Sequence, residues 1–143
     1  MLLADTNIWL ALAISKHQFH GAARTWISGV KTTQKVAFCR ATQQSFLRLL
    51  TTHAVITPYG IPTLTNEEAW DTYNEFLADP RITWASEPKG IDALWKQFAA
   101  RPLSSPKLWM DAYLAAFAFS RGDQLVTTDK AFSQFAGLNV IIL

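Results

Sequence analysis

The fold is decided near the start of the chain, where residues 2–5 read Leu-Leu-Ala-Asp. Three apolar residues in a row predict a short strand that is buried on both faces, and the acid marks its end. The same pattern returns at residues 124–127, Gln-Leu-Val-Thr, which run into Thr128 and Asp129. If the two strands are parallel, Asp5 and Asp129 emerge at one edge of the sheet, where such folds place their chemistry.

Working outward from these strands, helical patterns alternate with short apolar segments along the whole chain. Further strands are predicted at residues 36–38, 81–84 and 139–142. Helices are predicted at residues 5–14, 18–28, 42–50, 65–79, 91–100, 105–120 and 130–135. This alternation predicts an α/β fold in which helices cover both faces of a parallel sheet.

Turn and cap residues punctuate the pattern. Residues 51–64 contain Pro58, Gly60 and Pro62, and are predicted to be a loop. Thr65 and Glu68 have the spacing of a capping box at the start of a helix. Ser105 followed by proline predicts an N-cap with proline at the first helical position.

Size and composition limit the class of protein. A chain of 143 residues, 50% hydrophobic and 17% charged, predicts a single folded domain over residues 1–143 and excludes disorder. Cys39 is the single cysteine, which excludes an internal disulfide and a cysteine-rich zinc site and indicates a reducing compartment. No apolar run is long enough for a membrane span, and the early Asp5 without a basic region does not resemble a signal peptide. We therefore expect a cytoplasmic protein with no membrane association.

Charge is distributed unevenly. Residues 1–66 carry six basic side chains and one acid, whereas residues 67–143 carry seven basic side chains and ten acids. The basic half can attract phosphate, but this excess alone is a weak signal for nucleic acid.

A third acid, Asp111, lies inside the apolar run Leu-Trp-Met-Asp-Ala-Tyr-Leu of residues 108–114. An isolated carboxylate among such neighbours is costly to desolvate, so it needs a cation, strong donors or access to water. Three carboxylates at one edge would repel one another unless a hard divalent ion such as Mg²⁺ or Mn²⁺ joined them. Such a site suits the hydrolysis of phosphodiesters.

Each acid also has a purely structural interpretation. Asp5 and Asp129 could cap the helices that follow them, and Asp111 could be a satisfied core carboxylate. Asp123 follows Arg121 and Gly122 and is predicted to be a solvated turn residue. The acids between residues 67 and 79 are predicted to form a solvated helix face.

With these residues in place, the chain resembles the PIN-domain family and, within it, the VapC-type ribonuclease toxins of toxin–antitoxin pairs. Residues 3–10, Leu-Ala-Asp-Thr-Asn-Ile-Trp-Leu, are similar to the first acidic motif of the family. Residues 110–118 are similar to its acidic helix, and residues 125–132 to its last strand and acid. Each motif is weak alone, but the three in this order are fairly specific.

The resemblance implies a three-layer α/β/α sandwich with a short central parallel sheet. It also implies a Mg²⁺-dependent endoribonuclease that is inhibited by an antitoxin, with RNA as its substrate. Asp5, Asp111 and Asp129 would be the catalytic and metal-binding acids, with Asn7 and Thr128 as polar support. We also expect a homodimer.

One departure from the family pattern concerns the third helix, where many PIN nucleases carry a glutamate. No carboxylate occurs between Thr6 and Asn66, and the matching stretch offers Gln43 and Gln44. We expect one of these amides to point toward the acids, which weakens any two-metal proposal. The departure keeps open a second function, a catalytically weak or inactive PIN-like module that binds RNA or a partner. A small phosphatase or another metal hydrolase is a third, less favoured, alternative.

Other residues suggest contacts with RNA or a protein. Arg40 and Arg48 could hold an RNA backbone. Arg48 could also pair with a site carboxylate, or it could be a plain surface residue. His17 and His20 could contact RNA or brace their loop. The surplus of aromatic residues leads us to expect an apolar surface for the antitoxin on the early helices. Its candidates are Ile8, Trp9 and Trp26, although all three could equally belong to the core.

Overall fold

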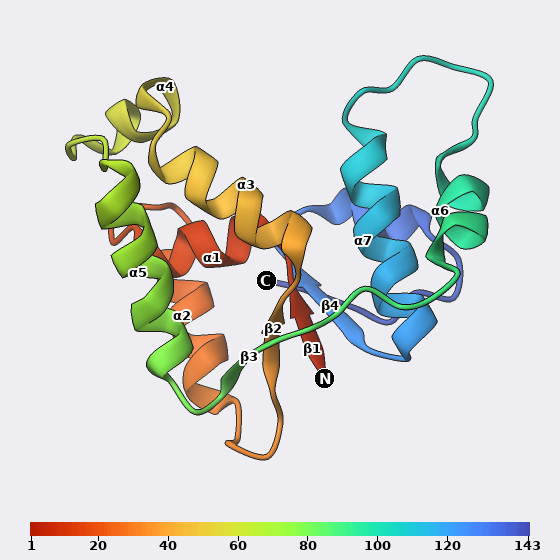
Figure 1. The fold of residues 1–143 in the computed structure, drawn as a ribbon, viewed down its shortest axis with the longest axis horizontal. Helices are drawn as coiled ribbons and strands as arrows, with labels where there is room; N and C mark the ends of the chain where they lie inside the picture. Colours follow the sequence, from red (N-terminus) through yellow and green to blue (C-terminus); the bar gives the residue numbers. More distant parts are fainter.

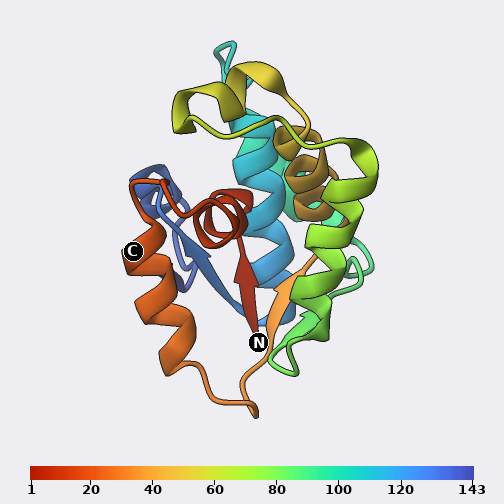
Figure 2. The ribbon, with the colours of Figure 1, turned by 90° about the vertical axis from the view of Figure 1, so that its left-hand side faces the viewer.

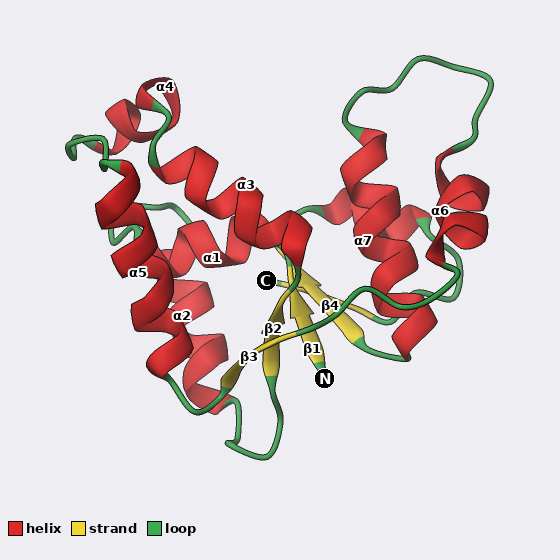
Figure 3. Ribbon diagram, viewed as in Figure 1, coloured by secondary structure: helices red, strands yellow, loops and turns green.

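The computed structural model describes residues 1–143 as a five-stranded sheet in the order β3-β2-β1-β4-β5. Every pair of neighbouring strands is parallel (Figure 3). The strands are β1 (Leu2–Ala4), β2 (Val36–Phe38), β3 (Ile82–Trp84), β4 (Gln124–Thr127) and β5 (Val140–Ile142). Because all strands point the same way, the sheet has one amino edge and one carboxyl edge, and β1 lies at its centre.

Helices cover both faces of this sheet (Figure 1). The elements are α1 (Thr6–Ala13), α2 (His20–Gly29), α3 (Arg40–Leu50), α4 (His53–Ile56), η1 (Thr57–Tyr59), α5 (Asn66–Ala78), α6 (Ile91–Ala99), α7 (Leu108–Arg121) and η2 (Lys130–Gln134). Figure 2 shows α1 end-on between α2 and α5, with α7 behind it. The predicted three-layer α/β/α sandwich is confirmed. None of the helices combines the length and hydrophobicity needed to cross a bilayer.

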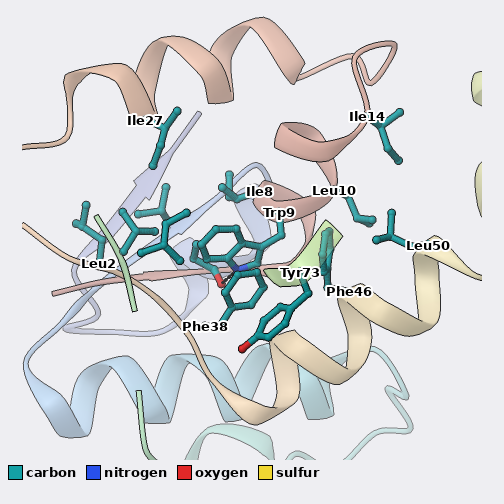
Figure 4. Packing of buried hydrophobic residues seen from close by; sticks show 14 of the residues in the cluster. Leu2, Ile8, Trp9, Leu10, Ile14, Ile27, Phe38, Phe46, Leu50 and Tyr73 are labelled. Carbon is teal, nitrogen blue, oxygen red and sulfur yellow. Dashed lines mark hydrogen bonds between the residues drawn. The ribbon is translucent and has the colours of Figure 1, made fainter. Parts of the chain in front are cut away.

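Alternation along each strand divides the buried side chains between two cores. Leu2 and Ala4 belong to the core under α1, α2, α3 and α5, whereas Leu3 belongs to the core under α6 and α7. The first core is aromatic: the rings of Trp9 and Phe38 stack with centroids 3.6 Å apart (Figure 4). The indole of Trp9 donates to the carbonyl oxygen of Ala4 at 3.1 Å, which fixes α1 against the end of β1.

The structure differs from the sequence-based expectation in one loop and at the start of α7. Residues 51–64 are not simply a loop, because α4 and η1 lie within them. The predicted cap at Ser105 is wrong: its carbonyl accepts from Leu108 N in a turn, and α7 begins only at Leu108. The capping box of Thr65 and Glu68 is confirmed, with both of its hydrogen bonds present.

The expected antitoxin surface at Ile8 and Trp9 is wrong. Both side chains are fully buried, and Trp26 is partly buried against the same core. The aromatic surplus is instead absorbed by the stacked core and by exposed side chains elsewhere. The exposed large apolar residues are Met1, Trp70, Leu77, Trp84, Leu103, Trp109, Met110 and Phe119.

Candidate active site at the carboxyl edge of the sheet

Asp5 and Asp129 both lie at the carboxyl edge, after the neighbouring strands β1 and β4. Each uses one carboxylate oxygen as a helix cap: Asp5 Oδ1 accepts from Thr6 N at 2.6 Å, and Asp129 Oδ1 accepts from Ala131 N at 2.8 Å. The capping interpretation is therefore correct, but it accounts for only one oxygen of each acid. The second oxygens accept from side chains, Thr127 Oγ1 at 2.8 Å for Asp5 and Lys107 Nζ at 2.9 Å for Asp129.

Thr127, the last residue of β4, connects the two strand ends. Its hydroxyl donates to Asp5 and accepts from Asn7 Nδ2 at 3.1 Å and from the backbone N–H of Asp129 at 3.0 Å. A hydroxyl has one hydrogen and two lone pairs, so all of its bonding capacity is used here. Thr127 was not among the residues predicted from the sequence, although a hydroxyl at the end of a buried strand, two residues before an acid, was a usable signal.

Asn7 and Thr128, the two residues expected to support the acids, lie beside this hydroxyl, and only one of them uses its side chain. The Asn7 side chain donates to Thr127 and its Oδ1 accepts from the backbone N–H of Thr128 at 3.3 Å. Thr128 thus contributes its main chain, and the neighbouring hydroxyl of Thr127 supports Asp5.

Asp111 reaches the same edge from the first turn of α7. It lines a small hollow of about 190 Å³ together with Lys107, Ala131 and Gln134. Burial raises the pKa of Asp111, and the charge of Asp129 raises it further. The acid stranded in the apolar helix is thus half-buried and near the strand-end acids.

The electrostatics of the edge favour a cation. Burial raises the pKa of Asp5 to about 6 against the hydrogen bonds from Thr127 and Thr6, and the charges of Asp111 and Asp129 add to the rise. The pKa of Asp129 is held below its ordinary value by the Ala131 N–H and by Lys107. Three carboxylates therefore share one ammonium group.

Hard oxygen donors of this kind fit Mg²⁺ or Mn²⁺. The structure contains no group of three or more His, Cys, Asp or Glu side chains that is close enough to share a metal ion as it stands. In this arrangement Asp129 is turned toward Lys107. The donor set therefore suits a divalent ion, but in this arrangement Asp129 is paired with Lys107 instead.

The structure does not bring Gln43 to the acids. Its side chain is buried, and its amide oxygen accepts from Arg40 Nη1 next to the Tyr73 hydroxyl. Because α3 begins at Arg40, Gln43 lies on the core side of the helix together with Phe46 and Leu50. Gln44 is exposed, and its expected approach to the acids stays a prediction.

The predicted basic contacts are placed as follows. The guanidinium of Arg40 lies over the Trp84 ring, 4.6 Å from its centroid, at the far strand β3. Arg48 is exposed and lines a shallow pocket between α3 and α5 beside Trp70. His17 and His20 brace their loop, since His17 Nδ1 accepts from Phe19 N and His20 Nδ1 contacts the carbonyl of Ala11.

Asp123 is not the solvated turn residue that the sequence predicted. It is only 7% exposed, and it pairs with the N-terminal ammonium of Met1 at 2.8 Å and with Arg121 Nε at 2.7 Å. Gly122 adopts a left-handed φ of 67°, which turns the chain from α7 directly into β4 beside β1. This acid therefore lies at the amino edge, away from the other three.

Comparison with known proteins places this geometry in a family. Residues 2–138 match the PIN domain. Ribonuclease VapC41 of Mycobacterium tuberculosis is 55% identical over 144 aligned residues, which cover 100% of this chain and 99% of that protein. A crystal structure of VapBC2 from Rickettsia felis, bound to a DNA fragment of its promoter, superposes with a TM-score of 0.72 at 12% identity, covering 99% and 98% of the two chains. VapC20 of M. tuberculosis, a toxin that cleaves the sarcin–ricin loop, gives a TM-score of 0.67 at 15% identity, covering 96% of each chain.

Proposed function

Since this chain belongs to the PIN-domain family, in its VapC-type toxin branch, we propose that it is the ribonuclease toxin of a toxin–antitoxin pair and depends on a divalent metal. The observation that carries this proposal is the group of acids at the carboxyl edge, within the segment that matches the family. The name of the 55% identical relative supports a ribonuclease, and the acids supply the reason for a metal.

Asp5, Asp111 and Asp129 would hold Mg²⁺, with Mn²⁺ as a substitute. Such an ion, when bound, lowers the pKa of water and offsets charge on a phosphate. Asp5 is the most firmly placed of the three, because Thr6 and Thr127 fix both of its oxygens. The chain has no organised serine or cysteine nucleophile, since its one cysteine, Cys39, is buried under α7. We therefore expect direct attack by water without a covalent intermediate.

Single-stranded or loop RNA is the substrate that this site suits best. A phosphate in an unpaired strand can approach the acids at this edge, whereas a duplex would span the edge. The exposed Arg48 is available to contact phosphates, whereas Arg40 is engaged with Trp84 and Gln43, and Lys107 is paired with Asp129. Binding should therefore depend strongly on salt.

The partner proposed for this chain is an antitoxin protein. Solved neighbours include the VapBC2 assembly of R. felis and VapBC-1 of Haemophilus influenzae, and the fold of this chain matches theirs. Ile8 and Trp9 are excluded from the contact by burial. A homodimer stays part of the proposal, to be tested by sedimentation of the free protein.

Cleavage of a labelled stem–loop RNA with Mg²⁺, Mn²⁺ or EDTA tests the function. Asp111→Asn should lower cleavage by roughly 100-fold or more, because one ligand charge is lost, while RNA binding survives. Asp92→Asn, an exposed acid on α6, is the matched control and should cleave normally. Full activity in EDTA, or in Asp111→Asn, would contradict the proposal.

The second candidate function is a binding module that does not cut. It is favoured by the missing acid on α3, a gap that the buried Gln43 does not fill. RNA binding without cleavage in any metal would establish this alternative.

A further inference from the structure

Lys107 occupies a singular place among the charged groups. Of the four ion pairs in the structure, three lie at the amino edge of the sheet, and the fourth joins Lys107 Nζ to Asp129 Oδ2 at 2.9 Å. Lys107 immediately precedes α7, one helical turn before Asp111, so the lysine and the acid project from the same side. Its ammonium is attracted by Asp129, Asp111 and Asp5. It is thus the one cation that the chain itself supplies to the acids.

We propose that Lys107 is an exchangeable counter-ion of the carboxylate site. In the metal-free protein it neutralises Asp129, and it moves to a phosphate of the bound RNA when a divalent ion takes its place. The inference rests on the proposed function, which it deepens by assigning a residue that both competes with the metal and contacts the substrate.

Because Lys107 is exposed, breaking its ion pair with Asp129 costs little free energy. The Lys107 side chain is 74% exposed, whereas that of Asp129 is 28% exposed. An exposed ion pair contributes little to stability, and a lysine has a long flexible stem that can carry its charge to another anion. The partner acid stays in place, because its other oxygen caps η2 through Ala131 N. The lysine is therefore the mobile member of the pair.

Competition follows from the shared oxygen. A divalent ion that used Asp129 Oδ2 would place like charge beside the ammonium, which repels it. A phosphate brought to the same edge offers the ammonium a new partner. The hollow beside the pair, lined by Asp111, Gln134 and Arg101, leaves room on this side for the ammonium to move.

Mn²⁺ binding to the full-length, RNA-free protein, measured by calorimetry, tests the competition. Lys107→Gln should bind Mn²⁺ about two- to fivefold more tightly, a gain of the size of one exposed ion pair. Lys107→Arg keeps the charge and should bind like the wild type. Lys130→Gln is the matched control, because Lys130 is an exposed neighbour of Asp129 that forms none of the structure's ion pairs.

RNA binding tests the second half of the exchange. With the three acids intact and a stem–loop whose linkages resist hydrolysis, affinity is measured over a salt series with Mn²⁺ present. Lys107→Gln should make the negative slope of log K against log salt shallower by about 0.7, the value of one contact to a single-stranded phosphate. Lys130→Gln should leave this slope unchanged.

The outcomes separate this inference from the proposed function. Equal Mn²⁺ affinity in wild type and Lys107→Gln overturns the competition even if RNA is cleaved, and weaker affinity shows that Lys107 positions Asp129 instead. An unchanged salt slope overturns the contact with phosphate. Tighter Mn²⁺ binding in a protein that cleaves no RNA supports the exchange while the ribonuclease function fails. If neither protein binds Mn²⁺, both proposals fall.

Discussion

The acids of the amino edge and Asp5 at the carboxyl edge are held in opposite ways. At the amino edge, Asp123 pairs with the N-terminal ammonium and Arg121, and Asp79 pairs with Arg81 at 2.6 Å. Each of these arginines lies two residues from its acid, and Arg81 also donates to the carbonyl of Ile27. At the carboxyl edge, Asp5 accepts only from neutral donors, the Thr6 N–H and the Thr127 hydroxyl.

The contrast distinguishes an acid that stabilises the fold, which we call an anchor, from an acid of the candidate active site. An acid neutralised by the chain's own cations is electrostatically complete and contributes to stability. Asp5 is instead half-buried beside two further acids, and its pKa is raised to about 6. A carboxyl whose pKa is raised by burial and by neighbouring acids is a candidate for a functional group, whereas the paired acids of the amino edge are not.

The largest expected effect comes from Asp5→Asn. Cleavage should fall by roughly 100-fold or more because a metal ligand is lost. The unfolding free energy of the metal-free protein at pH 7 should stay equal or rise by up to about 1 kcal/mol, since an unfavourable charge is removed. Cleavage assays and urea unfolding of the same preparation measure both quantities. A large loss of stability would show that Asp5 is an anchor after all.

Asp123→Asn should show the reverse behaviour. We expect the unfolding free energy to fall by about 2 kcal/mol, because two partly buried cations lose their partner. The cleavage rate of the folded protein should stay the same, since Asp123 lies at the other edge. Asp92→Asn serves as the exposed control in urea unfolding. Lost cleavage in a variant that is still folded would break the comparison.

Thr127→Val and Thr128→Val test which of the two threonines supports Asp5 at the carboxyl edge. Of these two threonines, only Thr127 donates to Asp5. Its replacement should therefore lower Mn²⁺ affinity and cleavage by about tenfold, as for other groups that orient a metal ligand. Thr128 offers its backbone N–H, which valine retains, so its variant should stay within about twofold. If the two variants lost Mn²⁺ affinity and cleavage equally, the supporting role that we give to the Thr127 hydroxyl would be wrong.

The smallest expected effect concerns Asp79 and pH. Arg81 holds the pKa of Asp79 below its ordinary value of 3.8. The pairing therefore stabilises the fold above that value, and this contribution is lost as the pH falls through the lower pKa of the folded state. Asp79→Asn should cost about 0.5–1 kcal/mol at pH 7. In urea unfolding across pH 2–7, this difference from the wild type should shrink as the pH falls below 3.8; a constant difference would contradict the assignment.

The site was predictable wherever a local pattern determined the outcome. Asp5 and Asp129 could be placed because an acid after a buried strand must emerge at the strand's end. Asp111 could be placed because a charge in an apolar helix needs an explanation. Asp123 could not, since its environment depends on Met1, which is 122 residues away in the sequence.

The orientation of the glutamines on α3 could not be predicted from the sequence either. The sequence predicted a helix from residue 42, but Thr42 bonds back to Cys39 N, and α3 begins at Arg40. Which of two adjacent glutamines faces the core then depends on how α5 packs against α3, and not on the residues of α3 alone. The burial of Trp9 likewise depends on Phe38 from another strand.

The hydrogen bond between Thr127 and Asp5 has a consequence for the timing of synthesis. Its two residues are 122 positions apart in the sequence. At about 5–20 residues per second, roughly 6–25 seconds pass between the synthesis of one and of the other. Throughout this interval the nascent chain contains the first acid but lacks β4, Thr127 and Asp129. The acid-bearing edge of the sheet is therefore incomplete on the ribosome almost until translation of the chain is finished.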